Sequence, residues 1–335
     1  MGMSRVGAIT LASGEDDLIT AVIDQPNGYA YFGAYLTPPQ VIKVQLSDFT
    51  RIGALDHGDT IGRPRSGVID QPNGYVYFGT HTAPGRVIKI RVSDFTLIGS
   101  LTLVTGETNL VSAVIDQPNG FAYFGTETSP GRVVKVQLSD FTRVGAIKLA
   151  TGETNLRSAV IDQPNGYAYF GTTESPRKIV KVRLSELARV GAITLASGEG
   201  PVTSAVIDQP NGYAYFGLES IPGRVVKVRI SDFSRVGTLI LESGENYLRS
   251  AVIDQPNGYA YFGTWTSPSK IVKIKLSDLT REQAITLASG ENNVSGAIID
   301  QPNRFAYFGT CTSPGRVVKI KLAGRTQLLQ IMGMQ

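Results

Sequence analysis

Hydrophobic and polar positions alternate along the chain in short runs, and the same runs return at a fixed spacing. Ala21-Val22-Ile23-Asp24 and Tyr29-Ala30-Tyr31-Phe32 are rich in β-branched and aromatic residues, and Gln-Pro-Asn-Gly separates them. Such runs favour strands. A linker with Pro in its second position and Gly in its fourth is typical of a tight turn that ends on a left-handed glycine. We therefore expect residues 21–33 to form a β-hairpin.

This hairpin returns six more times, nearly unchanged. The aspartate that precedes the linker recurs every 46 residues, at Asp24, Asp70, Asp116, Asp162, Asp208, Asp254 and Asp300. We interpret the repeated Asp and Asn as turn residues, because the linker offers too few oxygens for calcium. In the seventh copy Arg304 replaces the glycine. A non-glycine residue there costs on the order of 1 kcal/mol, so we expect slight strain in that copy.

Each repeat contains two further runs with the period of a strand. Residues 41–46 alternate, Ser-Asp-Phe-Thr turns the chain, and residues 51–55 return. No stretch has helical periodicity. Four short antiparallel strands in a repeat of this length are typical of a β-propeller, in which each sheet is covered by its neighbours. The predicted fold is therefore all-β, a seven-bladed β-propeller with four strands per blade. The alternative is fourteen two-stranded hairpin blades.

The phase of the repeat predicts how the ring closes. The chain opens with residues 5–11, which match a fourth strand, whereas the last copy stops after the third strand at 316–322. We expect the N-terminal strand to pair with the last blade, which removes an open sheet edge. The propeller domain would then span residues 4–322. The tail, residues 323–335, has a strand-like segment and would be an extra or competing edge strand.

Charge and cysteine content exclude several classes of function. The chain has 32 basic and 28 acidic residues and a net charge of +4, too balanced to indicate nucleic acid. No apolar run approaches the roughly 20 residues of a membrane span. One cysteine supports neither a disulfide framework nor a zinc cluster within the chain. We expect a monomer without membrane partner, metal or cofactor. The compartment stays open, with the cytoplasm as the default.

The repeat resembles the blade of YVTN-type seven-bladed propellers, which are relatives of NHL and PQQ-like propellers. The matching residues are clearest in one copy: Ala205–Gly212, Tyr213–Phe216, Val225–Val228 and Val236–Leu239. The resemblance implies the propeller fold over nearly the whole chain, and it is specific for fold rather than function. The copies are so alike that we expect either recent amplification or a consensus sequence. The irregular linker 56–65 favours a natural chain.

The resemblance implies scaffold and surface-layer roles for many members and enzymatic roles for a few. A streptogramin-lyase-like group looks to need an active-site histidine and an acidic partner around a metal. This chain has only His57 and His81, and neither recurs in other copies. The resemblance therefore carries no enzymatic activity over to this chain.

Positions that vary between the copies indicate where a partner would bind. One variable column follows the second strand: Tyr35, His81, Glu127, Thr173, Glu219, Trp265 and Cys311. A second precedes the first strand: Ile19, Arg65, Val111, Arg157, Thr203, Arg249 and Ser295. Strand direction places both on one face, as two rings with the second nearer the central channel. Aromatic and arginine side chains dominate binding energies at interfaces, whereas neutral drift in exposed loops would also produce such variation.

Three charged columns are interpreted as structural. Basic residues begin most third strands: Arg86, Arg132, Lys178, Arg224, Lys270 and Arg316. Glutamates recur in the links between blades: Glu15, Glu107, Glu153, Glu199, Glu245 and Glu291. We expect these two columns to form ion pairs with each other rather than a polyanion site. A mid-strand lysine recurs from Lys43 to Lys319, and its stem should lie along the neighbouring blade.

Three hypotheses for function follow. The first is a non-enzymatic binding or scaffold propeller that holds a peptide, glycan or protein through Tyr35, His81, Glu127, Glu219, Trp265, Arg65, Arg157 and Arg249. The second is a hydrolase or lyase at the channel mouth that uses His81 with Glu127 or Glu219. The third is a repeat-amplified propeller with no ligand of its own. Cys311 lacks a repeated histidine partner, so we assign no catalytic residue to it.

Overall fold

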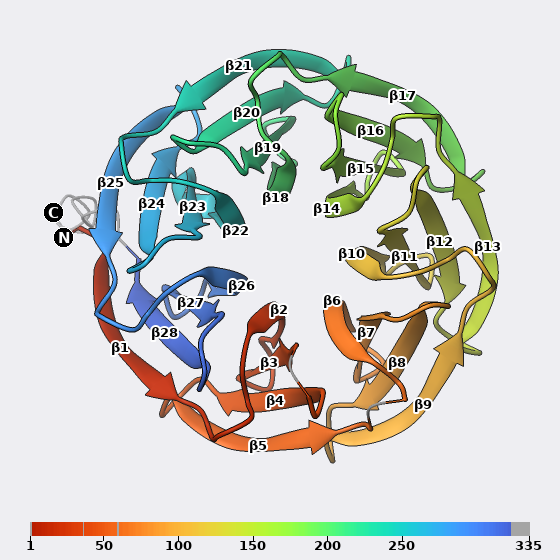
Figure 1. Ribbon diagram of the computed structural model, residues 1–335, viewed down its shortest axis with the longest axis horizontal. Coiled ribbons are helices and arrows are strands. Elements are labelled where there is room, and N and C mark those ends of the chain that lie inside the picture. The colour runs from red at the N-terminus through yellow and green to blue at the C-terminus, as the bar shows by residue number, and fades with distance from the viewer. Residues whose placement is uncertain (1, 36, 59, 323–335) are drawn as a thin grey trace, which may run out of the picture.

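The computed structural model describes residues 2–35, 37–58 and 60–322, which form seven four-stranded antiparallel sheets around a central axis (Figure 1). Strands that are adjacent in a sheet are consecutive in the chain, except in the sheet β1-β28-β27-β26. The prediction of a seven-bladed β-propeller with four strands per blade is confirmed. Because β3 pairs with both β2 and β4, the alternative of fourteen two-stranded blades is wrong.

Each blade runs from an inner strand beside the channel to an outer strand at the rim. The inner strands of blades one to seven are β2 (Leu18–Asp24), β6 (Arg63–Asp70), β10 (Leu110–Asp116), β14 (Leu156–Asp162), β18 (Val202–Asp208), β22 (Leu248–Asp254) and β26 (Val294–Asp300). The second strands are β3 (Tyr29–Ala34), β7 (Tyr75–His81), β11 (Phe121–Thr126), β15 (Tyr167–Thr172), β19 (Tyr213–Leu218), β23 (Tyr259–Thr264) and β27 (Phe305–Thr310). The third strands are β4 (Gln40–Gln45), β8 (Arg86–Arg91), β12 (Arg132–Gln137), β16 (Lys178–Arg183), β20 (Arg224–Arg229), β24 (Lys270–Lys275) and β28 (Arg316–Lys321). The outer strands are β5 (Thr50–Asp56), β9 (Thr96–Thr102), β13 (Thr142–Lys148), β17 (Ala188–Thr194), β21 (Ser234–Ile240), β25 (Thr280–Thr286) and, in blade seven, β1 (Ser4–Thr10).

The two faces of the ring carry different connections. The loop face bears the connections from second to third strands and the links between blades. The turn face bears the Gln-Pro-Asn-Gly and Ser-Asp-Phe turns, and the 3-10 turn η1 (Gln255–Asn257) lies there. The described residues contain no helix with the length and hydropathy that a membrane crossing requires.

The Gln-Pro-Asn-Gly turns have the predicted chemistry. Gly28 has φ of 70° and donates its N–H to the Gln25 carbonyl over 3.2 Å. The Asn27 side chain donates to the Asp24 carboxylate over 2.9 Å, so the repeated aspartate and asparagine bind each other across the turn. Arg304 adopts the same left-handed conformation as the glycines, with φ of 60°.

Arg304 provides a direct test of this conformational cost. We expect Arg304→Gly to raise the free energy of unfolding by up to about 1 kcal/mol, because glycine has no Cβ penalty in the left-handed region. The matched change is Gly120→Arg, at φ of 71° and with no heavy atom within 4 Å of an added Cβ. It should cost about the same amount. Urea unfolding of both variants measures this, and equal stabilities would contradict it.

The hydrophobic core lies between the blades. On β3, Phe32 packs toward blade seven against Tyr307 and Val317, whereas Tyr31 packs toward blade two against Phe78. Both Tyr31 and Phe32 have no exposed surface. Each second strand is therefore covered on both sides, which explains why it reads as a nearly continuous apolar run rather than an alternating one.

The recurring lysine has the structural role predicted for it. The Nζ of Lys43 lies 4.0 Å from the centroid of the Tyr29 ring and donates to the Val92 carbonyl of the next blade over 3.3 Å. Burial lowers the pKa of Lys43, and the nearby Asp24 opposes that shift. The lysine stem thus crosses the junction between two blades.

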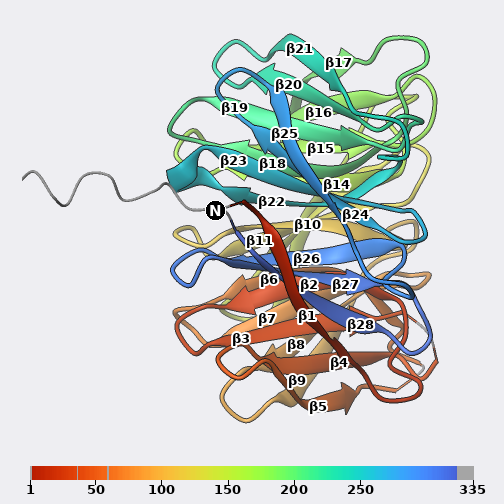
Figure 2. The ribbon, with the colours of Figure 1, turned by 90° about the vertical axis from the view of Figure 1, so that its left-hand side faces the viewer.

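The N-terminal strand closes the ring as predicted. β1 pairs with β28 from Ser4 opposite Lys321 to Thr10 opposite Arg316, and it lies outside β28 in Figures 1 and 2. The flanking residues Met3 and Leu11 are buried. Residues 323–335 lie outside the described residues, and so does the predicted competing strand.

The glutamates of the links form ion pairs, but not with the predicted partners. Each is buried and accepts hydrogen bonds from an arginine on the outer strand of the blade that follows the link. The pairs are Glu15–Arg51, Glu107–Arg143, Glu153–Arg189, Glu199–Arg235, Glu245–Arg281 and Glu291–Arg5. Of the basic residues that begin third strands, Lys178 alone reaches such a glutamate in the described part of the chain, at 4.0 Å from Glu153. Within its link, the Glu153 carboxylate also accepts the Ala150 N–H over 3.0 Å.

Candidate functional site

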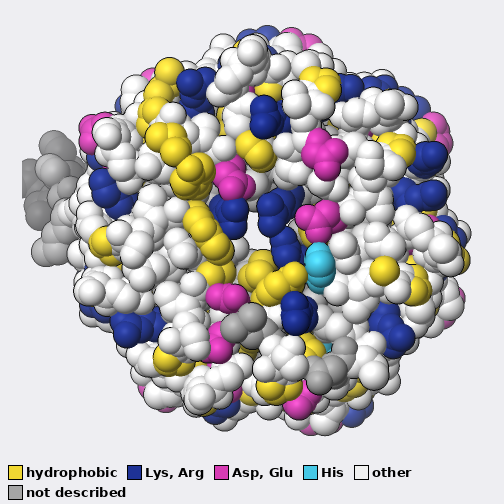
Figure 3. All heavy atoms as spheres, viewed as in Figure 1, with side chains coloured by type: hydrophobic (Ala, Val, Ile, Leu, Met, Phe, Trp, Pro, Cys, Tyr) yellow, Lys and Arg dark blue, Asp and Glu magenta, His cyan; other side chains and the backbone are white. Residues whose placement is uncertain are grey.

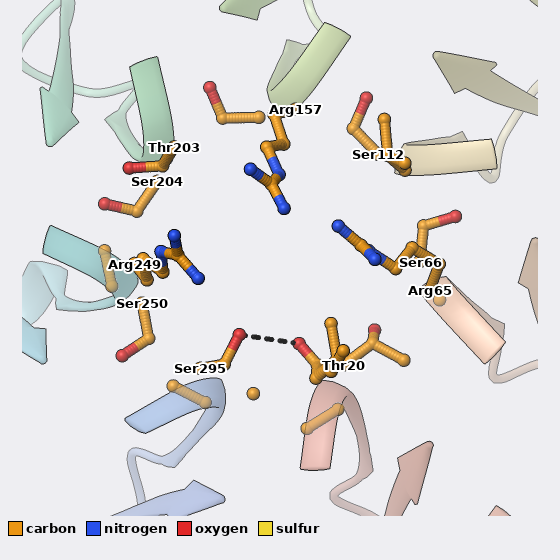
Figure 4. A pocket seen from close by; sticks show the side chains of 18 of the residues that line it. Thr20, Arg65, Ser66, Ser112, Arg157, Thr203, Ser204, Arg249, Ser250 and Ser295 are labelled. Atoms are coloured by element: carbon orange, nitrogen blue, oxygen red, sulfur yellow. Dashed lines mark hydrogen bonds between the residues drawn. The ribbon is translucent and has the colours of Figure 1, made fainter. Parts of the chain in front are cut away.

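A polar cavity of about 410 Å³ occupies the channel mouth on the loop face, where the seven inner strands begin. Its wall carries a ring of hydroxyl side chains that recur between the copies (Figure 4). These hydroxyls donate to backbone carbonyls of the next blade: Ser66 to Leu110 over 2.9 Å and Ser204 to Leu248 over 2.9 Å. The ring therefore fastens neighbouring inner strands and offers a rigid, neutral wall.

Three arginines project from this wall into the channel. Arg65, Arg157 and Arg249 lie on β6, β14 and β22, which belong to every second blade. Figure 4 shows their guanidinium groups pointing inward from three sides. The equivalent positions of the other blades hold Ile19, Val111, Thr203 and Ser295. The arginines are thus a feature of the channel and not of the blade frame.

Arg249 is held in place by protein groups. It donates to the Glu219 carboxylate over 2.6 Å, and its Cζ lies 4.0 Å from the centroid of the Trp265 ring. An ion pair and an aromatic face together fix a guanidinium more firmly than either does alone. Glu219 and Trp265 therefore act through Arg249 in setting the shape of the channel mouth.

Arg65 and Arg157 have no such carboxylate. Among the described residues, neither guanidinium has an acidic group within 4.0 Å or a hydrogen bond to the protein, and Arg65 lies over the Tyr35 ring with its Cζ 5.0 Å from the centroid. Both side chains are half-buried. Burial lowers the pKa of Arg157, and the positive charges of Arg65 and Arg249 lower it further, against the attraction of Glu127 and Glu219.

Beside the arginines, three neighbouring blades contribute a hydrogen-bonded chain of side chains. The Tyr35 hydroxyl lies 3.3 Å from His81 Nδ1, and His81 Nε2 lies 3.1 Å from a Glu127 carboxylate oxygen. The hydrogen bond from His81 lowers the pKa of Glu127 against its partial burial, and Arg65 and Arg157 add to this effect. Figure 3 shows basic, acidic and histidine side chains gathered around the opening.

The structure brings the eight predicted site residues together around one opening. Tyr35, Arg65, Arg157, Arg249 and Trp265 line the cavity. His81, Glu127 and Glu219 lie outside its lining and are bonded to, or are charged neighbours of, the residues that form it. As the sequence predicted, the arginine ring is the one nearer the channel.

Sequence reasoning missed two features of the cavity. One is the hydroxyl ring, which is formed by Thr20 and by a serine in the next five copies, whereas Gly296 stands at this position in the seventh. The other is Asp17, which lines the cavity and has a left-handed φ of 51°. Burial, and then the neighbouring Asp16, raises the pKa of Asp17. The sequence feature that could have identified Asp17 is the charge difference from the equivalent residues of three other copies, Asn109, Asn155 and Asn293.

The remaining titratable groups offer little for nucleophilic or metal chemistry. Cys311 lines the cavity, but burial and the nearby Asp17 raise the pKa of its thiol, which disfavours the thiolate. Burial lowers the pKa of His57 to about 4, against the attraction of Asp56. Within residues 2–35, 37–58 and 60–322, no group of three or more His, Cys, Asp and Glu side chains is placed to hold a metal ion.

The fold and the site together define a seven-bladed β-propeller with a charged cavity at its channel mouth. No protein-family model matches the chain, and no curated protein matches it. Among solved structures, the chain is similar to Kuenenia stuttgartiensis hydrazine synthase, with a TM-score of 0.78 and 11% identity over 95% of this chain and 97% of that chain. A likeness at this identity shows the fold alone. The resemblance to YVTN-type propellers stays a prediction.

Proposed function

We propose that this protein is a non-enzymatic binding propeller that takes its ligand at the channel mouth of the loop face. The observation that carries the proposal is the contrast between the repeat positions that stay constant and the positions that vary around the cavity. The copies are nearly identical, yet the two columns in which they differ most meet around one cavity of about 410 Å³. Pockets of this size hold small molecules.

Several side chains around this opening are held by one another before any ligand arrives. Trp265 and Glu219 position Arg249, and Tyr35, His81 and Glu127 form one hydrogen-bonded chain. Residues held in place in this way lose little conformational entropy on binding, so more of the contact energy appears as affinity. The combination of Trp, Tyr and Arg is also the one that contributes most at binding hot spots.

The test compares a channel-mouth triple variant with a matched triple variant on the turn face. Tyr35→Ala, Arg157→Ala and Trp265→Ala together should leave the melting temperature near that of the wild type but abolish thermal shifts caused by a ligand. The control replaces Arg91, Arg183 and Arg229, which pair with acidic neighbours three residues on, by Ala. A panel of glycans, peptides, carboxylates and phosphates is screened by thermal shift, and positive results are confirmed by calorimetry.

Two outcomes would contradict the proposal. A ligand that binds the channel-mouth variant and the wild type equally would place the binding site elsewhere. No response to any panel member would favour the alternative of a repeat-amplified propeller without a ligand.

A hydrolase or lyase is the second candidate, favoured by the 3.1 Å contact between His81 and Glu127. A histidine paired with a carboxylate can act as a general base. Tyr35, however, occupies the other ring nitrogen of His81. Stoichiometric metal in the purified protein, measured by ICP-MS and lost in His81→Ala, would favour this candidate over simple binding.

A further inference from the structure

We propose, building on the binding role above, that the channel mouth binds a small free anion with at least two negative charges, a phosphate ester or a polycarboxylate, between Arg65 and Arg157. The observation behind this is a set of half-buried guanidinium donors without protein acceptors. The two arginines come from blades two and four and point into the same cavity (Figure 4).

No described residue of the cavity wall accepts a hydrogen bond from these two guanidiniums. The ring hydroxyls Ser66, Ser112, Ser158 and Ser204 each donate to a backbone carbonyl of the next blade, over 2.5–3.3 Å. Those carbonyls thereby already receive a hydrogen bond. A half-buried cation without a counter-ion is costly, and that cost is relieved when an anion supplies the missing acceptors.

The acidic groups nearby are engaged elsewhere. Glu219 is bound to Arg249 at 2.6 Å, and Glu127 is bound to His81 at 3.1 Å. Each carboxylate attracts Arg157 from a distance without forming a hydrogen bond to it. Asp17 is the one acidic residue of the cavity lining in the described part of the chain, so it is the one lining carboxyl that opposes an anion.

The donors fit the proposed ligand class. A guanidinium presents paired N–H donors that match the oxygens of a phosphate or carboxylate, and two guanidiniums can bind opposite sides of one dianion. A volume of about 410 Å³ accommodates a small molecule rather than a folded chain. Arg249, already neutralised by Glu219, would border this ligand without being its main partner.

The other copies show that the frame does not require these arginines. The same position holds Val111 in blade three and Thr203 in blade five, where the Thr203 hydroxyl donates to the Leu248 carbonyl over 2.8 Å. Arg65→Thr and Arg157→Thr are therefore substitutions that the blade already accepts. Likewise Asp17→Asn introduces the residue of three other copies at a left-handed position that asparagine tolerates.

The experiment is calorimetric titration of the full chain with pyrophosphate and with citrate at neutral pH and low salt. Losing hydrogen bonds to a charged group predicts about tenfold or more weaker binding for Arg65→Thr and for Arg157→Thr, whereas Asp17→Asn should bind several-fold more tightly. Arg91→Thr, on the turn face, removes the same charge and should bind like the wild type. Without anion, Arg157→Thr should melt above the wild type, because the repulsion among the arginines is reduced.

The outcomes separate this inference from the binding role on which it rests. Equal affinity in Arg157→Thr and the wild type, or an equal loss in Arg91→Thr, would overturn the anion site. No binding of either anion to the wild type would also overturn it. If a neutral glycan or peptide then bound the wild type but not the channel-mouth triple variant, the binding role would stand without the anion.

Discussion

Deletion of residues 1–12 is expected to lower the free energy of unfolding by on the order of 5 kcal/mol or more. The deletion removes β1 and so leaves the third strand β28 at the open edge of blade seven. It also removes Leu11 and Met3, which are 5% and 3% exposed, and the arginine partner of the buried Glu291. Thermal and urea unfolding of the full chain and the deletion variant measure the loss.

The N-terminal strand is also held by a pair of hydrogen bonds from the neighbouring blade six. Gln283 on β25 replaces the glycine found at this position in other outer strands, and it exchanges two hydrogen bonds with the backbone of Met3, of 2.9 and 3.0 Å. Gln283→Gly should therefore cost only about 1–2 kcal/mol, much less than the deletion. Removal of residues 323–335 is the second control. If deletion of 1–12 left the melting temperature unchanged, the tail and not β1 would close the ring.

The fold could be predicted because the same strand and turn pattern occurs seven times in the sequence. The Tyr-Ala-Tyr-Phe run and the Gln-Pro-Asn-Gly turn each carry local information about strand and turn, and repetition at 46 residues excludes chance. The closure of the ring also followed from the phase of the repeat, because the last copy lacks a fourth strand and the N-terminal residues match one. These inferences needed no knowledge of side-chain contacts between blades.

The site could be predicted only in its position. Comparison between copies identified the variable columns, and strand direction placed them on one face, where Tyr35 and Arg157 now line the same cavity. Which side chains pair could not be predicted, because it depends on how each link folds. Glu107 was expected to meet the start of a third strand, but its carboxylate accepts instead from Arg143, 36 residues on.

Arg189→Leu is expected to cost about 2–3 kcal/mol of stability, because it leaves the fully buried carboxylate of Glu153 without its main partner. Blade two shows which residues can replace this ion pair. Its equivalents of Glu153 and Arg189 are Ile61 and Leu97, which belong to one hydrophobic cluster. Both members of the pair are thus replaced together, so Glu153→Ile with Arg189→Leu should recover most of the loss. Urea unfolding of the two single variants and the double variant measures this coupling.

The turn that contains Glu153 accounts for the part of the stability loss that the double variant does not recover. Glu153 also accepts the Ala150 N–H over 3.0 Å, and in blade two Asp56 takes over this role by accepting the Gly58 N–H over 2.8 Å. The double variant therefore leaves one N–H without its acceptor, at about 1 kcal/mol. Adding Lys148→Asp, at the position equivalent to Asp56, should restore it. Additive costs in the double variant would contradict this account of blade two.

The pH dependence of the same variants tests whether the pair acts through charge. Burial raises the pKa of Glu153, but hydrogen bonds from Arg189 and the Ala150 N–H and the nearby positive charges lower it further, so the net shift is below the ordinary 4.5. A carboxyl whose pKa is depressed in the folded state contributes stability above its unfolded pKa and loses it as the pH falls through the folded pKa. The advantage of the wild type over Glu153→Ile should therefore shrink below about pH 4.5. The double variant, which lacks the carboxyl, should lose correspondingly less stability than the wild type over the same range.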